Sequence, residues 1–457
     1  MLSPGSELVL VPEKAVAGGS MLARHEGRVV LVRGAIPGER VRARIERLAR
    51  DVAHGTVVDV IEPHEDRRQP PVDPACGGNA FAHITYKRQL LLKAEIVADA
   101  FARIAHAALP EPMEVAPSPE RGYRMRARFH VRGRHVGFYR ESTHDLCDAA
   151  TSGQLLPKAI ETVQAVAEPL VQNDSAADDV LGIELAENIA ADERAIHLEL
   201  RDERVADRLG IGVESGALTG LSWSVPSEMR TRVVLGTPYV TDGLDIRPLR
   251  SKSEGHPPPQ GSGAPGPPPQ GSGAPGPRVR RHVRAFFQAN RYLLSELVER
   301  VLALVPGGPV VDLYAGVGLF AVALASTRHD EVVAVEGDVI SAADLTANAA
   351  SCDRPYLSHH LSVEQFLRRS RKLPSCTLVI DPPRTGLSRD AMSGLKAGRP
   401  RRIVYVSCDV ATLARDVRSF VQSGYQLEHV EGFDLFPNTA HVETIAVLTN
   451  LTSKGDF

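Results

Sequence analysis

The sequence of 457 residues has few cysteines, no long apolar run and little net charge. Its five cysteines are odd in number and widely scattered, so we do not expect a disulfide framework, and a reducing cytoplasm is the natural location. No apolar run approaches the roughly 20 residues that a membrane-spanning helix needs. The N-terminus also lacks the basic and then apolar segments of a signal peptide. These absences predict a cytoplasmic protein that has no membrane partner.

The net charge of −3 does not by itself indicate a nucleic-acid partner, but the arginines are unevenly distributed. Six arginines lie between Arg33 and Arg50, and seven lie between Arg121 and Arg140, where no acidic residue occurs. In the second run three arginines alternate, so on a strand they share one face that can bind phosphates: Arg124, Arg126 and Arg128. A solvated sheet face is the favoured interpretation of either cluster alone, whereas the two together modestly favour RNA.

The length predicts two or three domains. Residues 1–65 contain four short β segments separated by Gly and Pro, which predicts a small β-barrel. Residues 66–250 are expected to form a mixed α+β central domain, in which residues 84–107 have the apolar spacing of a helix that can pack on the C-terminal domain. Residues 278–457 alternate strands and helices, which predicts a doubly wound α/β domain with ligands at the carboxyl ends of its strands.

A tandem repeat separates the last two domains. The segment PPPQGSGAPG occupies residues 257–266 and recurs unchanged at residues 267–276. Because its Pro, Gly and Ser cannot bury enough apolar surface to become ordered, we predict that residues 251–277 are a disordered linker. A proline-rich docking site is the less favoured interpretation.

The first chemical motif runs from Asp312 to Gly318, between a strand and a helix, and Glu336 ends the next strand. Glycines there let the backbone approach a ligand, and the glutamate can accept hydrogen bonds from the ribose of a nucleotide-like cofactor. The spacing also suits a nicotinamide enzyme, but the third glycine of a dinucleotide site is missing, since Phe320 and Ala321 stand in that part of the helix.

The second motif, Asp381-Pro382-Pro383-Arg384, follows a buried strand and suits a site where a flat base meets a methyl donor. Amino methyltransferases usually end this motif with an aromatic residue, so Arg384 argues against amino methylation. Cys408 lies between a strand and a helix, where the partial positive charge of the helix N-terminus favours thiolate. A small buried residue is the alternative for Cys408, and it is the interpretation we adopt for Cys352 and Cys376.

Two further candidates lie near the ends of the C-terminal domain. Glu443 enters the last apolar run, which is costly for an acid unless the acid is used, and a salt-bridged structural glutamate is the alternative. Gln288 precedes the first helix and either binds a cofactor or caps that helix. His441 either contacts phosphate or packs.

Six segments in order resemble the RNA uracil-5-methyltransferase family: FFQAN, DLYAGVGLF, VVAVEGD, IDPPRTGL, IVYVSCDVATLARD and FPNTAHVETIAVL. The resemblance implies a class I S-adenosylmethionine-dependent methyltransferase domain at the C-terminus and, at residues 7–62, a TRAM barrel that binds RNA. It also implies Cys408 as the nucleophile and Glu443 as the base that removes a proton. Four residues would bind the cofactor: Gln288, Tyr314, Glu336 and Asp381.

The family chemistry explains these residue types. A thiolate adds to C6 of uracil and makes C5 nucleophilic enough to take the methyl group, after which a carboxylate must remove the C5 proton. The base must be unstacked, so we expect structured RNA as the partner, with ribosomal RNA favoured over transfer RNA by the TRAM barrel. We expect the enzyme to act as a monomer.

One departure from the family concerns an iron–sulfur cluster, which many members hold on a C-x5-C-x2-C run and one downstream cysteine. Here Pro70 and Asn79 replace two ligands, and Cys76 and Cys147 remain as relics or as a buried pair. Two thiolates cannot hold a four-iron cluster, so we expect no cluster and no other metal.

Three alternatives remain beside a ribosomal-RNA uridine-5 methyltransferase. A transfer-RNA uridine-5 methyltransferase would use the same residues. A nicotinamide dehydrogenase would leave Cys408 and Glu443 unexplained. An RNA-binding protein with a decayed catalytic domain is suggested by the lost cluster ligands, but Cys408, Glu443 and Gln288 are all retained.

Overall fold

The computed structural model describes residues 2–141, 143–172, 179–208, 218–226, 230–246, 276–327, 331–370 and 373–451. The predicted linker at residues 251–277 lies outside these ranges except for its last two positions. Within the described residues, none of the helices combines the length and apolar character needed to cross a membrane.

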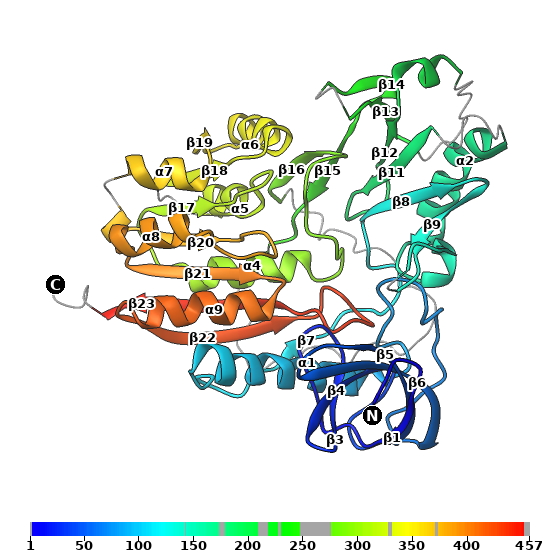
Figure 1. The fold of residues 1–457 in the computed structure, drawn as a ribbon. Helices are drawn as coiled ribbons and strands as arrows, with labels where there is room; N and C mark the ends of the chain where they lie inside the picture. Colours follow the sequence, from blue (N-terminus) through cyan, green and yellow to red (C-terminus); the bar gives the residue numbers. More distant parts are fainter. Residues whose placement is uncertain are drawn as a thin grey trace.

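The N-terminal part is a six-stranded β structure that curls on itself (Figure 1). Exposed and buried residues alternate along β5, RVRARIERL, so one face of this strand fills the interior and the other meets solvent. The interior is built from small and branched side chains such as Ala23, Val30 and Ile45. In sheet order the strands are β1 (Glu7–Leu10), β5 (Arg40–Leu48), β6 (Val52–Glu62), β4 (Arg28–Arg33), β3 (Met21–His25) and β2 (Lys14–Ala15).

The helix predicted at residues 84–107 is α1 (Tyr86–Ala100), which continues into the π-helical turn η1 (Phe101–Ala105). Its Leu92 and Ile96 belong to the barrel core, whereas Val97 and Phe101 pack in a core of the C-terminal sheet. The two apolar sides of one helix therefore join the barrel to the C-terminal domain.

The central part is a seven-stranded sheet, and α2 (Pro157–Gln172) covers its apolar face. Three short 3-10 helices accompany the described sheets: η2 (Ala149–Ser152), η3 (Glu203–Arg208) and η4 (Leu373–Ser375). In sheet order the strands are β10 (Leu146–Asp148), β9 (His135–Tyr139), β8 (Arg126–Arg132), β11 (Val180–Glu187), β12 (Arg194–Leu200), β13 (Gly220–Ser224) and β14 (Arg232–Gly236).

The C-terminal part is an eight-stranded sheet with helices on both faces (Figure 1), which confirms the predicted doubly wound α/β domain. Its strands β17 and β20 are buried along their whole length, as expected where helices cover both faces. The first five strands in sheet order are parallel: β19 (Leu357–His360), β18 (Val332–Glu336), β17 (Val310–Leu313), β20 (Thr377–Ile380) and β21 (Arg402–Ser407). The sheet continues with antiparallel β23 (Glu443–Asn450) and β22 (Tyr425–Phe433), and ends at β7 (Val115–Ala116).

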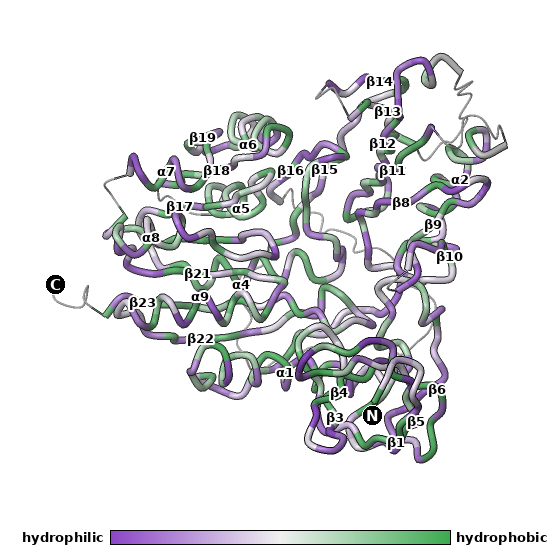
Figure 2. Tube along the Cα trace, in the orientation of Figure 1, coloured by the Kyte–Doolittle hydropathy of each residue, from purple (hydrophilic) through white to green (hydrophobic). Residues whose placement is uncertain are grey.

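Two apolar cores lie on opposite faces of this sheet. Helices α4 (Leu294–Leu304), α5 (Leu319–Thr327) and α6 (Val339–Ser351) form one with it. Helices α7 (Val363–Arg369), α8 (Arg389–Gly398) and α9 (Val410–Val421) form the other together with α1. Hydrophobic and hydrophilic residues both recur along the turns of α9 (Figure 2), and its buried apolar residues belong to the core on this face of the sheet.

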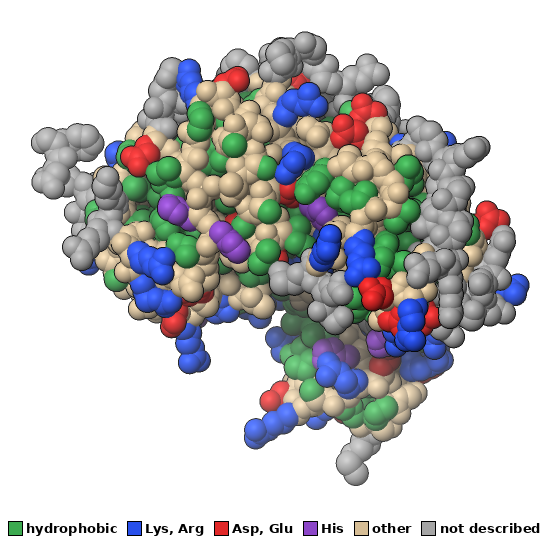
Figure 3. Space-filling model, turned by 90° about the horizontal axis from the view of Figure 1, so that it is seen from above, with side chains coloured by type: hydrophobic (Ala, Val, Ile, Leu, Met, Phe, Trp, Pro, Cys, Tyr) green, Lys and Arg blue, Asp and Glu red, His purple; other side chains and the backbone are tan. Residues whose placement is uncertain are grey.

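The central and C-terminal parts are joined by an antiparallel pair, β15 (Tyr239–Gly243) and β16 (Arg278–His282). The two strands lie on either side of the predicted linker, so the linker connects neighbouring strand ends. Seen from above, the surface is hollowed between a smaller lobe and a larger body (Figure 3). Lys and Arg side chains on the described part of this face are scattered among acidic and uncharged ones (Figure 3).

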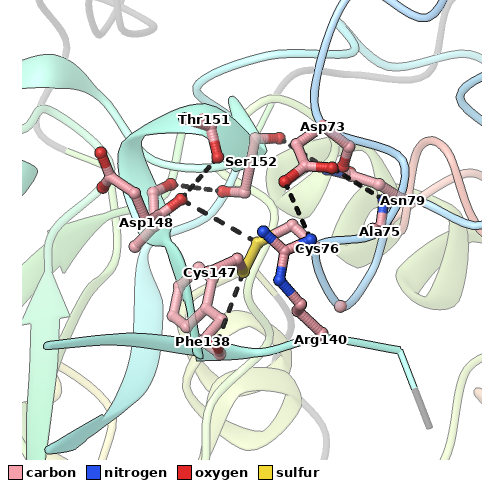
Figure 4. Close-up of a disulfide and its surroundings, with 12 residues drawn as sticks. Asp73, Ala75, Cys76, Asn79, Phe138, Arg140, Cys147, Asp148, Thr151 and Ser152 are labelled. Carbon is pink, nitrogen blue, oxygen red and sulfur yellow. Dashed lines mark hydrogen bonds and ion pairs between the residues drawn. A yellow bond between two sulfur atoms is a disulfide. The ribbon is translucent and has the colours of Figure 1, made fainter. Parts of the chain in front are cut away.

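Cys76 and Cys147, 71 positions apart, form a buried disulfide between the segment before α1 and β10 (Figure 4). Of the two interpretations considered for these cysteines, the structure has the buried pair. Asn79, which replaces a cluster ligand of the family, donates hydrogen bonds to the carbonyls of Asp73 and Ser152, at 3.0 and 3.1 Å (Figure 4). The side chain at this position therefore has a structural role.

Candidate active site

The turn after β17 has a backbone that only particular residues adopt easily. Tyr314, Gly316 and Gly318 all have positive φ angles, of 60°, 57° and 94°. A Cβ atom on Gly318 would lie 2.6 Å from the Tyr356 hydroxyl, whereas a Cβ atom on Gly316 would meet open space. Glycine at 318 therefore allows close packing, and the turn at 316 leaves room beside the backbone for a ligand.

Glu336 ends β18 next to this turn. One carboxylate oxygen accepts a hydrogen bond from the Gly316 amide at 2.8 Å, and the other accepts from the Gly337 and Asp338 amides at 2.7 and 2.6 Å. These bonds fix the carboxylate against the glycine turn. The oxygen that accepts from Gly316 has a lone pair left to accept from a ligand hydroxyl.

Asp381 follows β20, and Gln288 reaches it from the segment between β16 and α4. The amide nitrogen of Gln288 donates to Asp381 at 3.0 Å, although the two residues are 93 positions apart. Burial raises the pKa of Asp381, and the hydrogen bond from Gln288 acts in the opposite direction. Gln288 therefore contacts a predicted site residue, and no cap bond of this side chain to α4 is present in the described structure.

Asp312, in β17, is a site residue for which the sequence predicted no role of its own. Its side chain is fully buried, and one oxygen accepts from the Ala321 amide at 3.1 Å. The other oxygen lacks a hydrogen-bond partner among the described residues. Burial and then the charge of Asp381 raise its pKa well above the ordinary range. The signal was present in the sequence as an acid inside the apolar strand VVDL.

Cys408 lies between β21 and α9 and is half-buried. The expectation that the helix N-terminus would favour thiolate is wrong for this structure. Burial, and then the negative charges of Glu443 and Asp381, raise the pKa of the Cys408 thiol to about 12. The N-terminus of α9 is also capped by Asp409, whose side chain accepts from the Thr412 amide at 2.9 Å.

Glu443, the first residue of β23, is 1% exposed, and neither of its oxygens has a hydrogen-bond partner among the described residues. Burial raises its pKa well above the ordinary range, and the charge of Asp381 raises it further. A carboxyl group that is buried without a partner is costly, which is unusual unless the group is used. The absence of any hydrogen bond from the described residues to Glu443 argues against the alternative of a salt-bridged structural glutamate.

Arg384 supplies the positive charge of the site. Its charge opposes the raised pKa values of Cys408 and Glu443, and it hydrogen-bonds the thiol. The same charge, after the larger effect of burial, lowers the pKa of His441, whose ring also packs edge-on against Phe436. The cysteine, two carboxyl groups and this arginine therefore act on one another electrostatically at the carboxyl ends of the strands.

Phe286 is a second residue without a predicted role. Its side chain is 62% exposed, although it lies two positions before the buried Gln288. An exposed aromatic ring can stack on a nucleic-acid base.

The predicted arginine row is divided by the structure. Arg126 and Arg128 lie on one face of β8, where Arg126 pairs with Glu184 at 3.2 Å and Arg128 pairs with Glu184 and Glu199. Arg124 precedes the strand and donates to Gln154, and it lies near enough to Arg384 for the two charges to interact. Arg124 is therefore placed toward the candidate site, and RNA binding by the row stays a prediction.

Comparison with known proteins places this site in a family. The family model described as tRNA (uracil-5-)-methyltransferase matches residues 278–451, and the TRAM domain model matches residues 6–58. The 23S rRNA (uracil(1939)-C(5))-methyltransferase of Thiobacillus denitrificans is 31% identical over 447 residues, which cover 94% of this chain and 96% of that protein. The chain belongs to the RNA uracil-5-methyltransferase family.

Other relatives agree with this membership. A Thermotoga maritima protein named as an RNA methyltransferase is 30% identical to this family member. The match covers 97% of this chain and 98% of the Thermotoga maritima protein. The crystal structure of the Pyrococcus abyssi tRNA (uracil-54, C5)-methyltransferase superposes with a TM-score of 0.71, at 22% identity, over 97% of this chain and 100% of that one. This uracil-5-methyltransferase family member therefore has a TRAM β domain and the fold of an S-adenosylmethionine-dependent methyltransferase.

Proposed function

We propose that the protein transfers a methyl group from S-adenosylmethionine to C5 of a uridine in RNA, with Cys408 as nucleophile and Glu443 as base. The observation that carries this proposal is the group formed by the Cys408 thiol, Glu443 and Asp381, with Arg384 against them. A thiol beside a buried carboxyl group is what addition at C6 and proton removal at C5 require.

The cofactor site is proposed at the turn after β17. The open space beside Gly316, the Asp312 oxygen without a partner and the Glu336 carboxylate provide room and acceptors for a ligand with hydroxyl and amino groups. S-adenosylmethionine would supply an electrophilic methyl group there. Asp381 and Gln288 would position it from the side of the base, and Tyr314 would line the turn.

The proposed reaction uses the residues in sequence. The Cys408 thiol first loses its proton to water, the thiolate sulfur bonds to C6, and the C5–C6 π electrons move toward O4, so that C5 can attack the methyl group. The C5 proton then passes to Glu443, the C5–C6 double bond re-forms, and the bond between C6 and sulfur breaks. The raised pKa of Glu443 makes its carboxylate a stronger base than an exposed glutamate. Arg384 stabilises the thiolate when it forms and when it leaves.

The proposed substrate is ribosomal RNA. The Thiobacillus denitrificans protein, 31% identical over nearly the whole chain, is named for 23S rRNA, whereas the tRNA enzyme of known structure is 22% identical. The exposed ring of Phe286 offers a surface on which an unstacked base can stack. We propose that the enzyme acts as a monomer.

The proposal is tested by adding methyl-labelled S-adenosylmethionine to purified protein with unmodified 23S rRNA or tRNA. Nucleoside mass spectrometry should find 5-methyluridine in the 23S rRNA, and Cys408→Ala should abolish it. Label found in tRNA alone would show that the substrate is tRNA and not ribosomal RNA. Label on a nitrogen or a ribose oxygen would contradict the proposed mechanism.

We also propose that the protein holds no iron–sulfur cluster. Asn79 holds a loop in place of a ligand, and Cys76 bonds to Cys147. Anaerobically purified protein should contain no stoichiometric iron and show no thiolate-to-iron absorption. Bound iron that is lost in Cys76→Ser would contradict this.

A further inference from the structure

Most arginines of the two clusters that stand out in the sequence have acidic partners in the fold. In the barrel, Arg33 pairs with Glu46 at 2.6 Å and Arg44 pairs with Glu7 at 3.1 Å. Other barrel and β8 arginines also have acidic partners: Arg40, Arg42, Arg126 and Arg128. A cation that already has an acidic neighbour attracts a phosphate less than a free one.

Uncompensated positive charge gathers elsewhere, in a groove of about 650 Å³ between α8 and α9. Three of its lining cations, Arg389, Lys396 and Arg418, form no ion pair with any residue that the structure describes. One acid lines the groove, Asp416, and it is 3% exposed. The Asp416 carboxylate already has partners inside the protein. It accepts hydrogen bonds from the Tyr405 hydroxyl at 2.8 Å and the Leu387 amide at 2.9 Å, and it pairs with Arg415.

The groove begins beside the loop that leads from Arg384 of the candidate active site to α8. Arg415, which also lines it, donates to the carbonyl of Thr385 at 3.1 Å, and the Thr412 hydroxyl donates to the carbonyl of Arg384 at 3.1 Å. A Cβ atom on Gly386 would lie 2.5 Å from the Arg415 guanidinium, so α9 packs closely on this loop. The groove therefore lies next to the loop that carries Arg384, because α9 contacts both.

The spacing of the groove residues suits a linear chain of charges. On α8, Arg389, Ser393 and Lys396 are four and three positions apart, so they share one face. The seven steps from Arg389 to Lys396 rise by about 10 Å at about 1.5 Å per residue. A nucleic-acid strand places on the order of three phosphates over that length, at about 3.4 Å per charge.

We infer that the groove between α8 and α9 binds backbone phosphates of the RNA substrate next to the nucleotide that enters the active site. This inference rests on the proposed RNA methyltransferase activity, and it gives the RNA a path across the outer face of the catalytic domain. Phosphates are contacted by Arg389, Lys396 and Arg418, with hydroxyl donors from Ser393 and Ser419 beside them.

The test compares the triple variant Arg389→Gln, Lys396→Gln and Arg418→Gln with wild type on the same 23S rRNA fragment. Each lost phosphate contact lowers the slope of log Kd against log salt concentration by roughly one, so the slope should fall by about two to three. The Kd at about 0.1 M salt should rise tenfold or more, whereas kcat at saturating RNA should not change, because these cations lie outside the reacting group.

A matched control changes the net charge equally at exposed, ion-paired cations of the central part: Lys158→Gln, Arg201→Gln and Arg204→Gln. Its slope and Kd should stay near those of wild type. The single variant Arg418→Gln, with an unchanged melting temperature, should lower the slope by about one. Equal slopes and affinities for the triple variant and wild type would overturn the inference. The basic groove would then be a binding site for an acidic protein. Failure of the wild-type enzyme to methylate any RNA would instead contradict the proposed function.

Discussion

At the scale of single residues, the candidate site is built from acids in unfavourable places. Asp312, Asp381 and Glu443 are ionisable groups whose pKa values are raised chiefly by burial. Cys408 has a raised pKa for the same reason. Such groups lower stability at neutral pH, and they are retained where their ability to take or give protons is used.

The two proposed catalytic residues should fail at different steps. Cys408→Ala should bind S-adenosylmethionine but form no covalent RNA adduct. Glu443→Gln keeps the nucleophile but cannot take the C5 proton, so methyl transfer should occur once and then stop. A denaturing gel should show methylated RNA joined to the protein in Glu443→Gln, and this band should vanish when Cys408→Ala is added. Near wild-type turnover by Glu443→Gln would show that its assigned role is wrong.

Glu443→Gln should also raise stability at high pH. Because the folded-state pKa of Glu443 is raised, its contribution is fully present below the ordinary pKa of about 4.3 and is lost as the pH rises through the folded-state value. The variant removes this loss, so its melting temperature should exceed that of wild type by a few degrees at pH 8 and approach it at pH 4.

The neighbouring Glu431 provides a control of opposite sign. Burial raises its pKa, but hydrogen bonds from His429 and Arg300 outweigh burial and hold the pKa at about 2. Its contribution is therefore present above the ordinary pKa and lost as the pH falls toward 2. Glu431→Gln should lower the melting temperature at pH 8. If Glu443→Gln and Glu431→Gln both shifted the melting temperature at pH 8 in the same direction, the burial of Glu443 would not explain the effect of its substitution.

At the scale of secondary-structure elements, a buried polar cluster fixes the loop between β22 and β23 that leads to Glu443. Lys93 of α1 pairs with Asp434, both side chains being fully buried, and donates to the carbonyl of Phe436 at 3.0 Å. Gln89, one turn earlier, donates to the Asn438 side chain and accepts from its amide, both at 3.0 Å. The helix that joins the barrel to the catalytic domain therefore also holds this loop.

Removing one member of the buried pair should be costly. Lys93→Met leaves Asp434 without its counter-charge, which typically costs about 3–5 kcal/mol. The double variant Lys93→Met and Asp434→Leu removes both charges and should regain most of that loss. Urea unfolding measures both effects. If the pair positions the loop, kcat of the double variant should stay several-fold reduced while its stability recovers, and a full recovery of kcat would limit the pair to a structural role.

At the scale of the whole molecule, the chain crosses between its parts more often than a series of separate domains would. β7 joins the edge of the catalytic sheet from the segment after α1, and β15 pairs with β16 across the predicted linker. The barrel, the central sheet and the catalytic domain are thereby held by α1, the buried disulfide and this strand pair.

The tandem repeat between β15 and β16 should be dispensable. Its two ends are already joined by the strand pair, and halving the length of a flexible loop changes its closure free energy by only about 0.6 kcal/mol. Deletion of residues 257–276 should leave the melting temperature and the methylation rate nearly unchanged. A several-fold loss of activity in a folded deletion variant would mean that the segment contacts the RNA.

The sequence by itself determined the elements and the motifs at their ends. Strong apolar runs and helix caps are local features, and parallel strands place their carboxyl ends at one edge of a sheet, so the positions of Tyr314, Glu336, Asp381 and Cys408 along the fold could be predicted. The family followed from the order of those motifs.

The tertiary structure alone decided which of these residues contact one another and how they are charged. The contact of Gln288 with Asp381, the disulfide between Cys76 and Cys147, and the acids opposite Arg126 and Arg128 join positions from 56 to 93 residues apart. The helix at Cys408 predicted a thiolate, but burial beside Glu443 and Asp381 reverses the direction of its pKa shift. Local sequence patterns do not record burial or long-range neighbours, because both arise only when the sheet and its helices pack.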